Sequence, residues 1–277
     1  MTFWQDDYDA AADRADLLAF LTAVRPGEEP GTYIGEVAHH GRQQMFGGMI
    51  VGQTITALTR DVPADRRVHS LHAYYVRPTN GGTPITYDIE SIRDGRTFST
   101  RRFAAAQNGK TIFEGVCSYT TDTDGYLYDQ PLPSGLAPRE LGEAGNGPGG
   151  IEAVHLGPTE PDAEGIFEST DRKWFRWPDD IGDDPHLHNA FFGFVSDWTN
   201  IGSRPRKLNW DNPEYGIASL DHAVWFHRPA RIDEWHYSDM HALVNYGGRS
   251  LVRITIRDEA GRLVASVGQE LLVKVLD

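Results

Sequence analysis

The sequence predicts an α+β fold made of two copies of one unit, each a helix followed by an antiparallel meander of strands. One observation is a repeated motif, because residues 70–78 (SLHAYYVRP) return about half a chain later at residues 219–229 (SLDHAVWFHRP). The other is the order of elements, since each half has an apolar helical segment before several β-rich segments. Solenoid repeats recur every ~20 to 50 residues, so this longer repeat indicates a pseudo-dimer within one chain.

The first copy, residues 1–121, is predicted to open with a short leading helix. Residues 16–24 place Leu17, Leu21 and Val24 at helical spacing before a proline-glycine pair, and such a pair ends helices. We expect this helix to pack on the main body of the copy.

A core helix is predicted to begin at Gly47. Val51, Ile55 and Leu58 follow at positions that share one helix face, and Pro63 comes after the end. The glycines at its start have no side chain that could cap the helix, so its N-terminus is bare. Four β-rich segments joined by tight turns then predict the meander. These segments cover residues 71–76, 86–92, 98–106 and 111–119.

Residues 122–150 are predicted to connect the two copies, because they hold four prolines and many glycines without an apolar period. Gly145, Gly147 and Gly150 formally match a dinucleotide-binding spacing. However, no strand leads into these glycines and Pro148 interrupts them, which argues against nucleotide binding.

The second copy, residues 151–277, repeats the order of elements. Its predicted helix carries Leu187, Phe191, Val195 and Trp198 on one stripe. A helix followed by a meander therefore occurs twice. The predicted strands cover residues 151–156, 173–177, 217–227, 236–244, 251–257 and 263–273.

Charge and composition predict a cytoplasmic globular protein that binds neither nucleic acid nor an anionic membrane. The formal net charge is −14, whereas surfaces that bind polyanions are basic. No apolar run is long enough to span a membrane, and the acidic start is unlike a secretory or mitochondrial signal. We therefore expect no stable membrane insertion. Cys117 is the single cysteine and cannot form an internal disulfide, in keeping with a reducing compartment.

Six motifs follow one another along the chain: FGGMIVGQ at 46–53, HSLHAYYVRP at 69–78, RDGRTFSTRR at 93–102, SDW at 196–198, SLDHAVWFHRP at 219–229 and GRLVASVGQE at 261–270. Together they resemble the acyl-CoA thioesterase II family over nearly the whole chain apart from the connector. Six ordered motifs are specific, whereas one alone is weak. The resemblance implies a double hot-dog fold, in which two antiparallel sheets are each wrapped around a central helix. It also implies hydrolysis of fatty acyl-CoA to free fatty acid and coenzyme A, without a cofactor or a metal.

Three polar residues are candidates for chemistry, and each also has a structural explanation. Asp197 is at the edge of the apolar stripe of the second helix, where a carboxylate is either solvated or partly desolvated. Gln269 shares a strand face with Val267 and Leu271, so it is either a satisfied core amide or a functional one. Ser219 either caps a strand end or orients water or substrate.

The resemblance implies that Asp197, Ser219 and Gln269 form the catalytic site, because they occupy the family's aspartate, threonine-or-serine and glutamine positions. Water oriented by Ser219 and Gln269 and deprotonated by Asp197 can attack a thioester carbonyl directly. No covalent intermediate is then required. Candidate oxyanion donors are the backbone amides at Gly47 and Gly48, or those at the start of the second helix.

An overlay of the two copies predicts one active site per chain. Gln269 falls opposite Cys117, and Ser219 falls opposite Val68. The first copy therefore lacks both polar side chains and is expected to keep scaffold and binding roles. Met49 stands where the family resemblance implies a glutamine, so we expect substrate positioning near this helix to differ.

Other residues give weaker signals. Several histidines invite a metal site, but no matching carboxylate or cysteine set completes one. Cys117 shows no sign of activation and is predicted to be a small buried apolar residue. The histidines considered are His39, His40, His69, His72, His186 and His188, while His222 and His227 are predicted to make structural hydrogen bonds. The arginines that could bind coenzyme phosphates are Arg96, Arg101, Arg102, Arg249 and Arg253.

Two other function classes stay open on the sequence. A hot-dog enoyl-CoA hydratase or dehydratase generally needs an Asp/His pair, which the Ser219 and Gln269 pattern fits poorly. A non-catalytic acyl-CoA binding module would bind the small-molecule substrate without hydrolysing it. Exposed sheet edges also predict a homodimer or a higher homo-oligomer.

Overall fold

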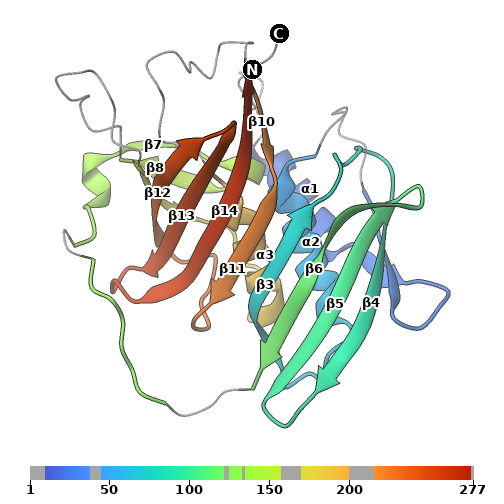
Figure 1. Ribbon diagram of the computed structural model, residues 1–277. Helices are drawn as coiled ribbons and strands as arrows, with labels where there is room; N and C mark the ends of the chain where they lie inside the picture. Colours follow the sequence, from blue (N-terminus) through green and yellow to red (C-terminus); the bar gives the residue numbers. More distant parts are fainter. Residues whose placement is uncertain are drawn as a thin grey trace.

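The computed structural model describes residues 10–37, 45–121, 125–132, 135–156, 170–199 and 215–275. Its first copy confirms the predicted core helix and the four strands of the meander (Figure 1). The leading helix ends at Thr22, earlier than predicted, because Val24 begins a short strand that pairs with the next one. The elements are α1 (Ala10–Thr22), β1 (Val24–Pro26), β2 (Thr32–Gly35), α2 (Gly47–Thr59), β3 (Arg67–Tyr75), β4 (Ile85–Asp94), β5 (Phe98–Gln107) and β6 (Lys110–Thr120).

The second copy also confirms the order of a helix followed by strands. Two details differ from the expectation. The predicted strand over residues 217–227 is divided at Leu220, because the Asp221 carboxylate accepts the N–H of Glu270 in place of a backbone carbonyl. Part of the predicted connector forms a paired strand, β7. The elements are η1 (Arg139–Leu141), β7 (Glu143–Asn146), η2 (Pro148–Gly150), β8 (Glu152–His155), β9 (Thr170–Arg176), α3 (Pro185–Ser196), β10 (Tyr215–Ser219), β11 (Asp221–Phe226), β12 (His236–Tyr246), β13 (Arg249–Asp258) and β14 (Leu263–Val275).

The strands of both copies join into one antiparallel sheet with the three α-helices on one side (Figure 1). From the centre outward, the order β3-β6-β5-β4-β2 in the first copy mirrors β11-β14-β13-β12-β9 in the second. The two halves meet where β3 pairs with β11. The predicted α+β class is confirmed, and the two expected sheets are joined because their inner edges satisfy each other's backbone groups.

The strand register supports the overlay of the two copies. Ala73 of β3 pairs with Gly115 of β6, and the equivalent residue of the second copy, Val224 of β11, pairs with Val267 of β14. Cys117 comes two residues after Gly115, and Gln269 comes two residues after Val267, so the two occupy equivalent positions.

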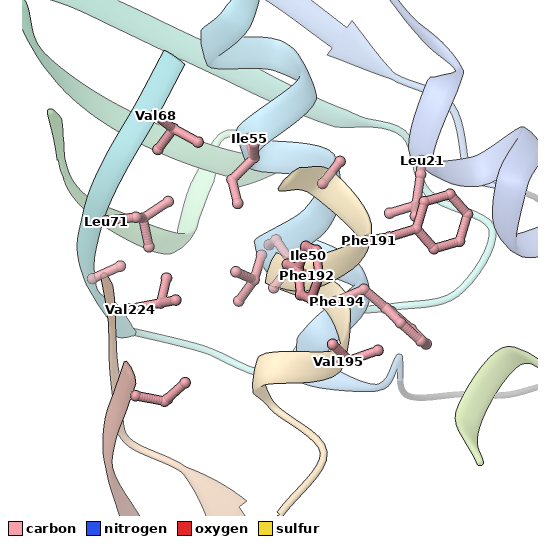
Figure 2. Close-up of a cluster of buried hydrophobic side chains, with 14 of the residues drawn as sticks. Leu21, Ile50, Ile55, Val68, Leu71, Phe191, Phe192, Phe194, Val195 and Val224 are labelled. Carbon is pink, nitrogen blue, oxygen red and sulfur yellow. The ribbon is translucent and has the colours of Figure 1, made fainter. Parts of the chain in front are cut away.

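The core lies between the helices and the sheet. Figure 2 shows that side chains of α2 and α3 meet those of the two central strands, β3 and β11. Ile50, Phe192, Leu71 and Val224 in this cluster are almost completely excluded from solvent. Both copies therefore share one apolar core, which fixes the two helices relative to the central seam of the sheet.

Helices α2 and α3 approach more closely than side chains would allow. A Cβ at Gly52 would lie 2.7 Å from the carbonyl oxygen of Ala190, and a Cβ at Gly48 would overlap the carbonyl of Phe194. Glycine is needed at both positions because it alone has no Cβ. The contact holds the first turn of α2 against the last turn of α3, and the candidate site lies at this junction.

Candidate active site

Asp197 lies at the junction of the two copies. It directly follows the last residue of α3 and is only 4% exposed. The start of α2 faces it from the first copy, and the backbone N–H of Gly48 donates to its carboxylate. Phe46 provides no side-chain cap for α2, and the Asp197 carboxylate is itself the anion held by the first turn of this helix.

Ser219 and Gln269 reach the same carboxylate from paired strands. Ser219 ends β10, and Gln269 lies in β14. The Gln269 amide nitrogen donates to Asp197 Oδ1 and, at 2.9 Å, to Ser219 Oγ. Ser219 Oγ donates to Asp197 Oδ1 at 3.2 Å. The structure thus brings together all three residues that the sequence singled out.

These hydrogen bonds orient the Gln269 amide. Because its nitrogen donates to both Asp197 and Ser219, its oxygen points elsewhere. That oxygen, Oε1, is buried without a hydrogen-bond partner among the residues that the structure describes. A buried acceptor without a donor is unfavourable, so the site is suited to a molecule that donates here. Water is such a molecule, since one hydrogen could go to Gln269 Oε1 and the other to Asp197.

The environment of Asp197 sets its proton affinity. Burial raises the pKa of Asp197 to about 6, while hydrogen bonds from Gln269, Ser219, Tyr75 and Gly48 act in the opposite direction. Burial disfavours the charged form and donors favour it. At neutral pH the carboxylate is therefore mostly ionised, yet it accepts a proton readily. A pKa close to the working pH is what an efficient general base requires.

Tyr75 is a site residue that the sequence analysis did not find. It ends β3 of the first copy, and its hydroxyl donates to Asp197 Oδ1 at 3.4 Å. The sequence did contain a signal, because position 75 shares the inward face of the strand with Leu71 and Ala73. A phenol on a buried face usually has a hydrogen-bond partner. The first copy therefore contributes both the start of α2 and this hydroxyl.

His222 lies beside Asp197 but carries no charge. Its Nε2 is 2.7 Å from Ser196 Oγ, and its Nδ1 is 4.0 Å from Asp197 Oδ1. Burial lowers the pKa of His222 to about 3, so the imidazole is neutral near pH 7. The prediction of structural hydrogen bonds is confirmed for His222 and also for His227, whose Nε2 is 2.9 Å from Ser266 Oγ.

An ion-pair cluster lies at the equivalent position of the first copy. Cys117 is fully buried, and burial raises the pKa of its thiol to about 12, which confirms the prediction of an unreactive apolar residue. Arg101, its neighbour in β5, is 2% exposed and binds Asp61 at 2.7 Å and Asp94 at 2.9 Å. The prediction that Arg101 binds a coenzyme phosphate is wrong, because two carboxylates already hold its buried guanidinium.

The other four predicted phosphate-binding arginines are exposed. Two of them pair with carboxylates: Arg102 with Glu90 at 2.7 Å, and Arg249 with Glu270 at 3.0 Å. Such exposed pairs are weak and exchange readily. A phosphate role for these two residues, and for Arg96 and Arg253, stays a prediction.

Gln53, which follows Met49 by one turn of α2, belongs to the fold rather than to the site. It is fully buried, and its amide donates to the carbonyl oxygens of Phe20 at 2.7 Å and Glu36 at 3.1 Å. Its oxygen accepts from the Tyr87 hydroxyl at 2.8 Å. All of its hydrogen-bonding groups are therefore engaged. The expected effect of Met49 on substrate positioning stays a prediction.

The predicted histidine pairs do not gather with other ligands where the structure describes them. His188 bonds backbone groups through both nitrogens, the Ile232 N–H at 3.2 Å and the Gly182 carbonyl at 2.9 Å. His69 Nε2 lies 2.8 Å from Ser118 Oγ. Across the described part of the chain, no three His, Cys, Asp or Glu side chains are grouped as a metal site needs. His39 and His40 fall outside that part.

Comparison with known proteins decides the family. Residues 36–120 match the family model for the acyl-CoA thioesterase N-terminal domain, and residues 133–273 match that for the C-terminal domain. The crystal structure of an acyl-CoA thioesterase II from Mycobacterium marinum is 32% identical, covers 93% of this chain and 97% of that chain, and gives a TM-score of 0.78. The chain belongs to the acyl-CoA thioesterase II family.

Two further comparisons place this thioesterase II chain. Acyl-CoA thioesterase 2 of Haemophilus influenzae is 27% identical over 265 residues, which cover 87% of this chain and 91% of that protein. A hot-dog protein from Alicyclobacillus acidocaldarius is only 14% identical, but it covers 94% of this chain and 98% of that chain with a TM-score of 0.74. The second likeness shows the fold alone, and it confirms the predicted hot-dog architecture.

Proposed function

We infer that this thioesterase II chain hydrolyses acyl-CoA thioesters to a free fatty acid and coenzyme A by direct attack of water. The observation that carries the mechanism is the convergence of Asp197, Ser219 and Gln269 beside the start of α2. Family membership and the names of the relatives, acyl-CoA thioesterase 2 and acyl-CoA thioesterase II, support the substrate class.

In the proposed reaction, water is held by the three side chains and Asp197 acts as the general base. The water oxygen forms a bond to the thioester carbonyl carbon while one of its protons passes to Asp197. The carbon–sulfur bond of the tetrahedral intermediate then breaks, and the proton on Asp197 leaves with the thiolate as coenzyme A thiol. Ser219 and Gln269 restrict the orientation of the water, which lowers the entropy cost of the attack.

The start of α2 is the proposed oxyanion site. The developing negative charge on the carbonyl oxygen needs donors that already point at it. The first turn of α2 supplies backbone N–H groups and the positive end of the helix dipole, and it has no capping side chain. Because the Gly48 N–H already donates to Asp197, the N–H of Gly47 is the proposed oxyanion donor. The start of α3 is disfavoured, because Asp184 caps that helix by accepting from the His186 N–H.

The site argues against the hydratase alternative. A hydratase needs a histidine that can exchange protons with substrate, and His222 is the histidine nearest to Asp197 among the described residues. Its Nε2 is engaged with Ser196, and burial holds its pKa far below neutral. His222 is therefore poorly placed and poorly tuned to act as an acid or base on an enoyl chain.

A thiol-release assay over acyl-CoAs of graded chain length tests the function. We expect coenzyme A and free acid to appear in equal amounts, with the rate depending on chain length. Enoyl-CoA incubated in parallel should keep its conjugated double bond. Tight binding of acyl-CoA without thiol release would instead support the non-catalytic binding module.

Self-association is part of the proposal. Tyr74, Val116 and Trp225, on the adjacent strands β3, β6 and β11, are between 38% and 65% exposed. Exposed apolar side chains gathered on neighbouring strands are typical of interaction surfaces. We expect light scattering to give at least twice the 30.9 kDa mass of one chain. A monomer mass at every working concentration would contradict this expectation.

We also propose a cytoplasmic location. The strong negative charge and the single cysteine, which is free and buried, support a reducing compartment without an anionic membrane partner. No helix in the described ranges is both long and apolar enough to cross a membrane.

A further inference from the structure

The hydroxyl of Tyr75 links the first copy to the carboxylate of the second. Tyr75 is positioned by the central seam of the sheet, because its backbone N–H donates to the carbonyl of Leu220 at 2.9 Å. Leu220 immediately follows Ser219, so the seam places Tyr75 next to the site. The phenol oxygen lies 3.4 Å from Asp197 Oδ1, the same oxygen that accepts from Ser219 and Gln269.

Packing does not require this hydroxyl. The aromatic ring of Tyr75 contacts Phe113, with 4.8 Å between the ring centroids, and a phenylalanine would keep that contact. The overlay of the copies places Phe226 at the equivalent position of β11, where an unsubstituted ring is 6% exposed. The ring therefore belongs to the core in both copies, whereas the hydroxyl is particular to the half that faces Asp197.

Near neutral pH, the Tyr75 hydroxyl is always a hydrogen-bond donor to Asp197 and never an acceptor from it. Burial, followed by the negative charge of Asp197, raises the pKa of the phenol well above its usual value. The hydroxyl thus stays protonated, and its hydrogen bond favours the ionised form of Asp197. This opposes the effect of burial, which favours the protonated form of Asp197, a form that cannot act as a base.

Around Asp197, hydrogen-bond donors rather than positive charges favour the ionised carboxylate. From α2, only the backbone of Gly48 donates, since its first turn has no charged residue. From β11, His222 is neutral, and Asp221 adds negative charge near Tyr75. From β10 and β14, Ser219 and Gln269 are uncharged donors. Among the described residues around it, Asp197 therefore has no cationic partner, and each donor contributes to keeping it ionised.

We propose that Tyr75 is a positioning residue of the hydrolytic reaction, which holds Asp197 in its ionised form and in the orientation that faces the water. The proposal rests on Asp197 being the general base. It assigns the first copy a direct part in tuning the base, in addition to the oxyanion site at the start of α2.

The test is the pH dependence of kcat/KM for Tyr75→Phe and for Tyr74→Phe as the matched control. Tyr74 is the adjacent tyrosine on the opposite, exposed face of β3. We expect Tyr75→Phe to move the acid limb of the profile up by about half to one pH unit, the usual effect of losing one donor to a carboxylate. Below the limb this corresponds to a loss of about 3- to 10-fold. Well above the limb, and in acyl-CoA affinity, the change should be smaller.

Two results would overturn the proposal. One is an unshifted acid limb in an active Tyr75→Phe enzyme, and the other is an equal shift in Tyr74→Phe. Asp197→Asn, measured in parallel, separates this failure from failure of the mechanism: if that variant hydrolyses normally, the base itself was wrongly assigned. If Tyr75→Phe unfolds, Tyr75→Met keeps an apolar side chain without a donor and should show the same upward shift.

Discussion

Asp197→Asn is expected to reduce turnover by about 10²- to 10⁴-fold, the usual contribution of a general base. The amide keeps the size of the carboxylate and can still accept from Ser219 and Gln269, but it cannot take a proton from water. The measurement is steady-state thiol release from a good acyl-CoA substrate near pH 7. Normal hydrolysis by this variant would point to another base.

The same variant should remain folded. The pKa of Asp197 is raised to about 6 from its ordinary value of 3.8, so in the folded state its ionised form is disfavoured. A raised pKa means that folding stability is lost as the pH rises from the unfolded value through about 6. Asparagine does not ionise, so the variant does not lose this folding stability. Its thermal unfolding midpoint near pH 7 should be no lower than that of the parent protein. Asp88→Asn, at an exposed position of β4, is the control that should change neither turnover nor stability.

Gln269→Ala is expected to lower turnover by about 10²-fold while acyl-CoA still binds, because a misplaced water attacks far less often. Cys117→Ala is the matched variant at the equivalent position of the first copy, and it should leave turnover largely intact. Its thiol is buried and inert, and it contributes mainly apolar contact. The measurement pairs acyl-CoA affinity with steady-state hydrolysis for both variants.

The paired design locates the active half of the molecule. If Cys117→Ala abolished hydrolysis and Gln269→Ala did not, the active site would lie in the first copy. A thiol mechanism would then have to replace the attack by water. Equal and small effects of both substitutions would show that neither position holds the water.

The fold could be predicted from the sequence where local pattern determines it. The repeated motif and the apolar spacing of Val51, Ile55 and Leu58 predicted the duplication and the core helix correctly. The joining of the sheets depends on pairing between β3 and β11, which are separated by more than half the chain, and no local pattern specifies such a contact. The break at Leu220 depends on a hydrogen bond of the Asp221 side chain, which spacing alone does not reveal.

The candidate site was predictable only in part. Asp197, Ser219 and Gln269 were found because their places in the helix and strand patterns coincided with the motif positions of the family that the sequence resembles. Tyr75 was missed because a tyrosine on the inward face of a strand also fits an ordinary core residue. Arg101 was misjudged because charge in a sequence suggests exposure, whereas in the structure two carboxylates hold this side chain in the interior.

The seam between β3 and β11 has a consequence for how such a molecule can change over generations. In a dimer of identical subunits, every substitution is made twice, so a residue that improves one site alters its twin in the same way. Here one chain carries both halves, and each position exists once. Glutamine at 269 and cysteine at 117 could therefore diverge independently, as could Tyr75 and Phe226. In the proposed mechanism the first copy needs no water site of its own, so the equivalent position can hold the ion pairs of Arg101 while the same half supplies the helix start and the phenol beside Asp197.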